Sequence, residues 1–264
     1  DTATNAFTGA ITITTNDASG TDADVTIDGG TTALQIAAST VDGDLTLTSG
    51  NASGITDTGT VTVGGNFSAT TDANNGVINV GTMAVDGTVA LTTNGNGAAT
   101  IVNDAGLNFA ASTVGGALSA TATTGDITDS GALTITGAST FITAVDGSNI
   151  VLDSSSNAFS NSVEMRADDG SEAFGNITFV DSAAVDFATG ANNNGDLFIN
   201  ASTDGAVGGN LSVTATTGNI TQNTALAISG TTTLSTSAND ATITLGTATN
   251  AFTGAITITT NDAA

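Results

Sequence analysis

The sequence repeats itself over a long interval. Residues 2–18, TATNAFTGAITITTNDA, recur unchanged at residues 247–263, an offset of 245 positions. A 17-residue identity at that interval is typical of one period of a tandem array followed by a short overlap. The sequence therefore predicts a repeat architecture, whose fold and function belong to the array and not to an isolated globular domain.

Shorter repeats divide the long period. The stretch that opens with Val114-Gly-Gly-Ala-Leu-Ser and ends in Gly-Asp-Ile-Thr returns at Val207, 93 positions later, and a weaker copy opens at Val41. We therefore predict that residues 1–264 form one continuous repeat structure. Its expected internal units are 41–113, 114–206 and 207–264, the last continuing beyond the chain, with residues 1–40 as the end of the preceding copy.

The middle unit is longer than the others. When it is aligned with the equivalent copy, eleven residues are added between Val180 and Leu197. An insertion at one place in a regular array projects as a loop or as an extra strand on one face. We take a surface loop as the simpler expectation for residues 181–196, whose role the periodicity leaves unexplained.

Apolar residues alternate with polar ones in short runs bounded by Gly, Asn or Asp, as in Ile11-Thr-Ile13 and Leu45-Thr-Leu47. Period-two alternation predicts half-buried strands, and no window keeps a helical period. A β-sandwich has a similar strand spacing, but tandem identity favours a solenoid. The predicted fold is all-β, a parallel β-helix (β-solenoid) with about 12 coils per 245-residue period if a coil takes about 20 residues.

The residue choices suit stacked coils. Ile, Val, Leu, Phe and Ala are expected to point inward, and Thr and Ser outward. Gly and Asn supply the positive φ of tight corners, and Asn side chains at equivalent corners can form amide ladders along the axis. The chain has no Pro, Trp or Tyr, which keeps every backbone N–H available for pairing and suits a narrow core.

The charge balance narrows the function classes. The net charge is −24, with Arg166 as the only basic side chain and no His or Cys. Nucleic acid is not an expected partner, because phosphates require Lys and Arg. Membrane insertion is not expected either, since no apolar stretch approaches the ~20 residues of a spanning helix. We predict no enzymatic activity and no catalytic or cofactor-binding residues, because the usual bases and nucleophiles are missing.

Two acidic clusters are the only candidates for a metal, and their oxygen ligands would suit calcium. They are Asp22, Asp24 and Asp28, and Asp168, Asp169 and Glu172. Neither has the spacing of a known calcium loop, so we interpret them as solvated turn carboxylates and predict no metal site. Thr-x-Thr pairs such as Thr46/Thr48 are similar to the ice-binding arrays of β-helical antifreeze proteins, but their spacing is irregular.

The phrases V-x-G-x-L-x-x-T…G-x-I-T and A-L-x-I-x-G resemble the repeat regions of filamentous-haemagglutinin-like adhesins and large β-strand-repeat surface proteins of bacteria. The resemblance implies a structural segment of a giant extracellular or cell-surface filament that spans distance, adheres or connects cells and matrix. Its implied partners are neighbouring repeats or identical chains end to end, and possible lateral fibre partners. Alternatives are a surface-layer or matrix protein that assembles laterally, and a solenoid that binds ice or carbohydrate.

Overall fold

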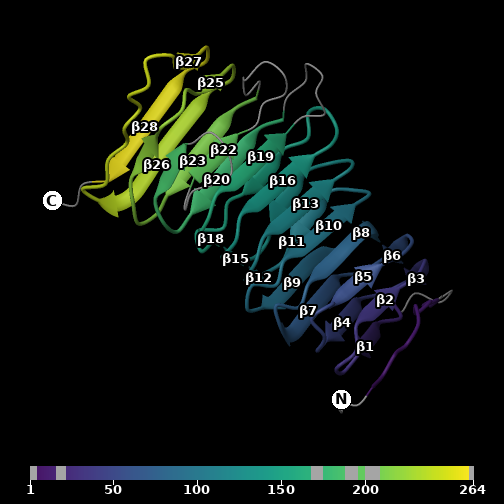
Figure 1. Cartoon of the computed structure of the whole chain (residues 1–264). Coiled ribbons are helices and arrows are strands. Elements are labelled where there is room, and N and C mark those ends of the chain that lie inside the picture. The colour runs from purple at the N-terminus through teal and green to yellow at the C-terminus, as the bar shows by residue number, and fades with distance from the viewer. Residues whose placement is uncertain (1–4, 16–21, 168–174, 188–195, 200–208, 262–264) are drawn as a thin grey trace.

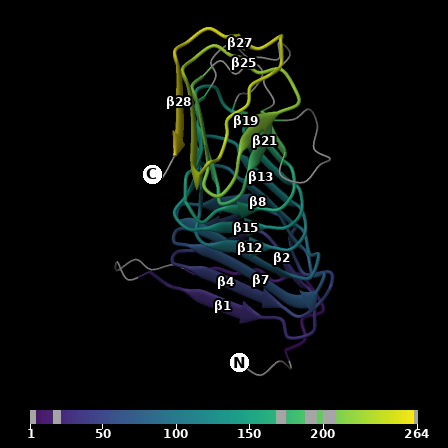
Figure 2. The same cartoon turned by 90° about the vertical axis from the view of Figure 1, so that its left-hand side faces the viewer.

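The computed structural model describes residues 5–15, 22–167, 175–187, 196–199 and 209–261. Within these ranges there is no helix, and all the strand pairs are parallel, for example β1 with β4, β10 with β13 and β26 with β28. The coils follow one another along a single axis from the N-terminal to the C-terminal end (Figures 1 and 2). The predicted parallel β-solenoid is confirmed.

One long sheet, which we call sheet 1, forms one side of the solenoid. Its main path runs through β1 (Val25–Asp28), β4 (Leu45–Ser49), β7 (Phe67–Asn74), β9 (Thr88–Asn94), β11 (Leu107–Phe109), β14 (Ile127–Asp129), β17 (Ile150–Leu152), β20 (Ile177–Asp181), β23 (Leu211–Ala215), β26 (Thr232–Asn239) and β28 (Ile256–Asn261). Three short strands extend it beside this path, namely β12 (Ser112–Val114), β15 (Leu133–Ile135) and β18 (Ala158–Phe159).

The opposite side is sheet 2. Its path runs through β2 (Leu34–Ile36), β5 (Ile55–Asp57), β8 (Ile78–Val85), β10 (Ala99–Asn103), β13 (Leu118–Ala122), β16 (Ser139–Thr143), β19 (Val163–Ala167), β22 (Asp196–Ile199), β21 (Val185–Phe187) and β24 (Ile220–Gln222). Beside it lie β3 (Ser39–Val41) and β6 (Val61–Val63), while β25 (Ala227–Ile228) and β27 (Ala251–Phe252) pair in a sheet of their own.

Each coil crosses sheet 1, turns, crosses sheet 2 and returns one step higher. Leu45 of β4 therefore lies beside Phe67 of β7, and Ile55 of β5 beside Ile78 of β8. Ten steps separate β1 from β28 in sheet 1, so a coil takes about 23 residues on average. Coils are wider than the expected 20 residues, because the corners are longer than predicted, and the period holds correspondingly fewer turns than the predicted 12.

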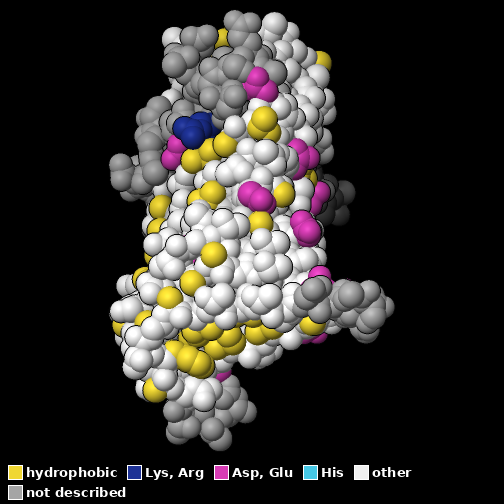
Figure 3. Space-filling view, turned by 90° about the vertical axis from the view of Figure 1, so that its right-hand side faces the viewer, with side chains coloured by type: hydrophobic (Ala, Val, Ile, Leu, Met, Phe, Trp, Pro, Cys, Tyr) yellow, Lys and Arg dark blue, Asp and Glu magenta, His cyan; other side chains and the backbone are white. Residues whose placement is uncertain are grey.

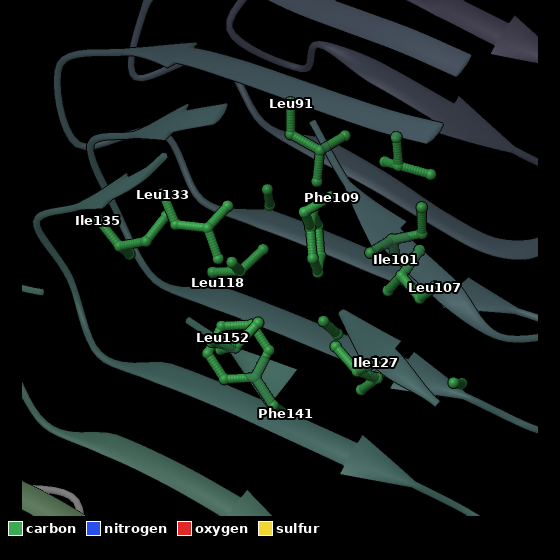
Figure 4. Close-up of a cluster of buried hydrophobic side chains, with 14 of the residues drawn as sticks. Leu91, Ile101, Leu107, Phe109, Leu118, Ile127, Leu133, Ile135, Phe141 and Leu152 are labelled. Carbon is green, nitrogen blue, oxygen red and sulfur yellow. The ribbon is translucent and has the colours of Figure 1, made fainter. Parts of the chain in front are cut away.

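The core is a narrow column of inward-facing side chains between the two sheets. Strands of five residues show the pattern buried, half-buried, buried, half-buried, buried, as in β4 and β13. Phenylalanines cross from one sheet to the other: the ring centroids of Phe109 and Phe141 lie 6.2 Å apart, edge to face, and those of Phe141 and Phe159 lie 6.1 Å apart. Figure 4 shows Phe109 and Phe141 among Leu118, Ile127 and Leu133. Edge-to-face pairs add to the burial of the rings.

Corners between strands use positive φ where the chains approach closely. Gly54, just before β5, has a φ of +64°, and a Cβ there would lie 1.7 Å from the carbonyl oxygen of Val77 in the next coil. Gly125 opens the Gly-x-Ile-Thr phrase before β14 with a φ of +82°. Only glycine fits such a corner without strain.

The sequence repeats lie on alternating sides of the solenoid. Leu45 of the first unit begins a strand of sheet 1, Leu118 of the second begins a strand of sheet 2, and Leu211 of the third returns to sheet 1. In the first two units the five-residue strand is followed by two strands of three residues, β5 and β6 or β14 and β15. The same phrase therefore builds the same half-coils on opposite sheets.

The stretch 181–196 contributes to sheet 2. Strand β22 pairs with both β19 and β21, since Leu197 lies beside Val163 on one side and Phe187 on the other. The expectation of a surface loop is therefore wrong for residues 185–187, which are paired in the sheet, and for the backbone of Asp196, the first residue of β22. Residues 188–195, which belong to the same stretch, lie outside the described ranges.

Candidate functional site: ladders of polar side chains

A ladder of polar side chains follows the corner at which each coil enters sheet 1. Asp24 accepts a hydrogen bond from the backbone N–H of Asp44 at 2.8 Å, and Asp44 accepts one from the N–H of Asn66 at 2.6 Å. Asn66 in turn accepts the N–H of Thr88 at 2.9 Å. Each of these residues immediately precedes an apolar strand residue of sheet 1 or, for Thr88, begins the strand.

The same ladder continues higher along the axis. Asp126 accepts the N–H of Asn149 at 2.7 Å, Asn149 that of Asn176 at 2.9 Å, Asn176 that of Asn210 at 2.8 Å and Asn210 that of Thr231 at 2.8 Å. The predicted amide ladder is confirmed, with Asp and Thr as further members. Because each rung satisfies a corner N–H of the next coil, the ladder fixes how successive coils are placed.

A gap separates the two stretches of the ladder. Gly106 occupies the equivalent corner before β11 and has no side chain to continue the chain of bonds. A shallow surface hollow lies there, lined by Asp86, Asn108 and Asp126 among others. The side-chain carbonyl oxygen of Asn108 is buried and has no hydrogen-bond partner among the described residues.

A second type of bond ties the short strands to the following coil. Asp57, at the end of β5, accepts the backbone N–H groups of Gly81 at 3.0 Å and Thr82 at 2.7 Å. Asp129, at the end of β14, accepts those of Asp153 at 2.9 Å and Ser154 at 3.3 Å. Both belong to an Ile-Thr-Asp phrase, so the repeated phrase carries a structural bond between coils.

Two buried asparagines brace the coil beneath them. Asn157 is fully buried, and its side-chain oxygen accepts the N–H of Leu133 at 2.8 Å. Asn250 accepts the N–H of Leu226 at 3.0 Å. Acceptor and donor are both shifted by the repeat offset of 93. The sequence had marked Asn157 and Asn250 as equivalent but had not indicated this role.

Two further polar side chains lie inside the core at the ends of strands. Asn103 is 1% exposed, accepts the N–H of Val85 at 2.8 Å and donates to the carbonyl oxygens of Val85 and Gly106. Asp181 is 2% exposed and accepts the N–H of Ala183 at 3.2 Å. Burial raises the pKa of Asp181 to about 6, and hydrogen bonds from backbone N–H groups offset only part of that effect.

The acidic clusters do not converge on a metal. Asp24 is a rung of the ladder, and Asp28 accepts the N–H of Gly30 at 2.7 Å, while Asp22 is exposed. In the described ranges no three acidic side chains form a group that could hold a metal ion. Asp168, Asp169 and Glu172 lie outside those ranges. The prediction that the chain has no metal site therefore stays a prediction.

A second surface hollow lies over β21 and β24. Its lining includes Phe159, Asp186 and Thr221, and the hydroxyl of Thr221 donates to the carboxylate of Asp186 at 2.7 Å. Figure 3 shows acidic side chains scattered over one face of the molecule, with basic colour at a single place, which is Arg166. The prediction that the chain is not an enzyme stays untested by this geometry. The described residues contain no helix long and apolar enough to cross a membrane.

Stacked parallel coils, a continuous core and polar ladders along a corner define a repeat protein of the β-solenoid class. Comparison with family models agrees with that class. The chain belongs to the family of repeats of unknown function (DUF5649), whose model matches residues 22–78, 96–166 and 174–259. Neither the curated proteins nor the solved structures contain a significant match.

Proposed function

We propose that this chain is a structural repeat segment of a giant extracellular or cell-surface filament or adhesin, whose task is to span distance and connect cells or matrix. The observation that carries the proposal is the coil-to-coil bonding. Sheet 1 runs from β1 to β28 with every strand paired to the next, and the ladders tie the corners. A structure bonded in this way along one axis is suited to act as a rod.

The composition supports an extracellular location. The single Arg166 and the absence of Lys leave trypsin-like proteases one cleavage position in 264 residues. The net charge of −24 favours solubility and repulsion between rods. The partners that we propose are neighbouring repeats of the same chain or identical chains end to end. We propose neither nucleic acid nor a membrane as a partner, and no cofactor.

The test is solution X-ray scattering of the chain beside a two-copy version that continues with residues 19–264. Ten steps of about 4.8 Å predict a rise of about 48 Å from β1 to β28. The two-copy version should keep the cross-section and add about 50 Å of length. Unchanged length with a thicker cross-section would contradict the rod. Antibody labelling of intact cells of the source organism tests the proposed location.

One observation favours the ice-binding alternative as a second candidate. Five outward threonines stack in successive coils of sheet 1, since Thr48 pairs with Thr70, Thr70 with Thr92, Thr92 with Thr113 and Thr113 with Thr134. The neighbouring column is less regular, with Thr46, Ser68 and Ala90. An assay of ice recrystallisation decides: inhibition that is lost in Thr92→Lys but kept in Thr140→Lys, on the opposite sheet, would support this second function.

A further inference from the structure

The two copies of the repeated 17 residues lie on opposite sheets. Ile11 forms a parallel bridge with Ile36 of β2, so the first copy belongs to sheet 2. Ile256, 245 positions later, lies in β28 beside Thr232, in sheet 1. The first copy precedes β1 by half a coil, and β28 follows β1 by ten steps. The long period therefore measures ten and a half coils.

The first copy is covered by the coil that follows it. The N–H of Ile11 donates to the carbonyl oxygen of Gln35 at 2.8 Å, and the N–H of Thr40 donates to that of Ile13 at 2.9 Å. The N–H of Ile13 also donates to the hydroxyl of Ser39 at 2.9 Å. As a result the side chain of Ile13 is 8% exposed.

The second copy has the same residues but no covering coil. Ile256 is 45% exposed and Ile258, the equivalent of Ile13, is 53% exposed. Both side chains lie in line with buried core residues of β26, since Ile258 pairs with Leu234. They are core residues that a further coil would bury.

The backbone of β28 is also oriented for a further coil. The N–H of Thr232 donates to the carbonyl oxygen of Ala255. Because both backbone groups of a residue in a parallel strand point to the same neighbour, residues 255, 257 and 259 bond to β26. Ile256, Ile258 and Thr260 then point to the open edge, and their equivalents in the first copy are the residues that bond to β2 and β3. Unpaired edges of this kind accept another strand.

We propose that the open edge of β28 is a docking surface for a second copy of this chain, which seats its β2 and β3 there in place of its own residues 11–15. The added copy is turned by half a turn about the axis, because its sheet 2 continues sheet 1 of the first. This inference rests on the proposed rod. Any surface feature of one copy is then displayed on the opposite side of the next.

Cysteine crosslinking between full-length chains tests the docking, since the natural sequence has no Cys. A donor chain carries Thr259→Cys, the equivalent of Thr14, which bridges Thr40 in the first copy. One acceptor chain carries Thr40→Cys, and a control acceptor carries Thr26→Cys on β1. Cα atoms of paired strands are close enough for a disulfide. Only the Thr40→Cys acceptor should form a mixed dimer, because Thr26 would approach β28 only if the copies stacked without the half turn.

The acceptor's own residues 11–15 compete for the same place. Adding Ile13→Lys to the acceptor should loosen them and raise the yield of the mixed dimer about tenfold over the matched Thr12→Lys acceptor, whose substituted side chain points outward. A free peptide of residues 2–18 should suppress the dimer, since it has the sequence of the docking strand. Circular dichroism checks that both acceptors keep the fold.

Two results would overturn the inference. Crosslinking through Thr26→Cys instead of Thr40→Cys would mean that copies stack without the half turn. Absence of a mixed dimer with either acceptor, including the Ile13→Lys form, would mean that β28 does not dock a second copy. Scattering from the single chain tests the rod separately, so failure of the docking and failure of the proposed function are distinguishable.

Discussion

The two copies of the 17-residue repeat show what a neighbouring coil contributes. Ile13 and Ile258 have the same sequence around them and face the same core, yet one is 8% and the other 53% exposed. The difference lies in β2 and β3, which cover the first copy and have no described counterpart over the second. Local sequence therefore sets the shape of a half-coil, while the next coil decides how much of it is buried.

The largest expected effect tests whether two covered copies are equivalent. Leu118 in sheet 2 and Leu211 in sheet 1 occupy the same place in the repeated phrase, and each is 1% exposed. Replacing either by alanine should lower the free energy of unfolding by about 2–5 kcal/mol, because a cavity is left in the core. Urea unfolding followed by circular dichroism measures both. A loss at one position less than half that at the other would break the equivalence of the two sheets.

The next prediction concerns a covered position that carries a charge. The pKa of Asp181 is raised to about 6, so the folded state holds this proton more tightly than the unfolded state does. Ionisation therefore destabilises the fold as the pH rises from about 4 through 6, by up to about 3 kcal/mol. Asp181→Asn should stabilise the protein at pH 7 and leave it unchanged at pH 4, in thermal unfolding at both pH values.

Asn103 supplies the matched control for Asp181. Asn103→Asp places a carboxyl at another buried strand end, where two carbonyl oxygens now accept from the amide. It should destabilise the protein at pH 7 more than at pH 4. If Asp181→Asn and Asn103→Asp change stability equally at both pH values, burial of the charge is not the cause.

A smaller effect compares the two bracing asparagines. Asn157→Ala should cost about 2 kcal/mol, because it leaves the N–H of the fully buried Leu133 without its acceptor. Asn250→Ala should cost about 1 kcal/mol, since Asn250 is only half-buried and water can replace it. Equilibrium unfolding of the two variants in parallel gives the comparison, and a larger loss at Asn250 would contradict it.

The smallest effect returns to the repeated segment. Ile13→Ala should lower the unfolding free energy by about 1.5 kcal/mol and Ile258→Ala by about 0.5 kcal/mol, in proportion to the side-chain area that is buried. Hydrogen exchange at the two ends of the solenoid measures the local change. Equal losses would show that the covering coil does not account for the difference in exposure.

Much of the fold could be predicted from the sequence. Alternation in runs such as Leu45-Thr-Leu47 and the repeats at Val114 and Val207 predicted stacked parallel strands, and Asn at the corners predicted the ladder that Asn149, Asn176 and Asn210 form. Asp129 and Asn157 were not predicted to bond to each other, although their side chains lie 2.7 Å apart. The signal was available, because Gln222 and Asn250 repeat that pair at the same offset of 93.

The sequence by itself determined the class of fold, because side-chain periodicity and repeat identity are properties of the chain. The placement of the repeats was decided only by the tertiary structure. Corner lengths vary, so that successive coils differ by 20 residues at Asp24 and Asp44 but by 34 at Asn176 and Asn210. Packing of those corners makes the period ten and a half coils instead of a whole number. That half coil puts one sequence on both sheets and leaves Ile256 and Ile258 at an open edge.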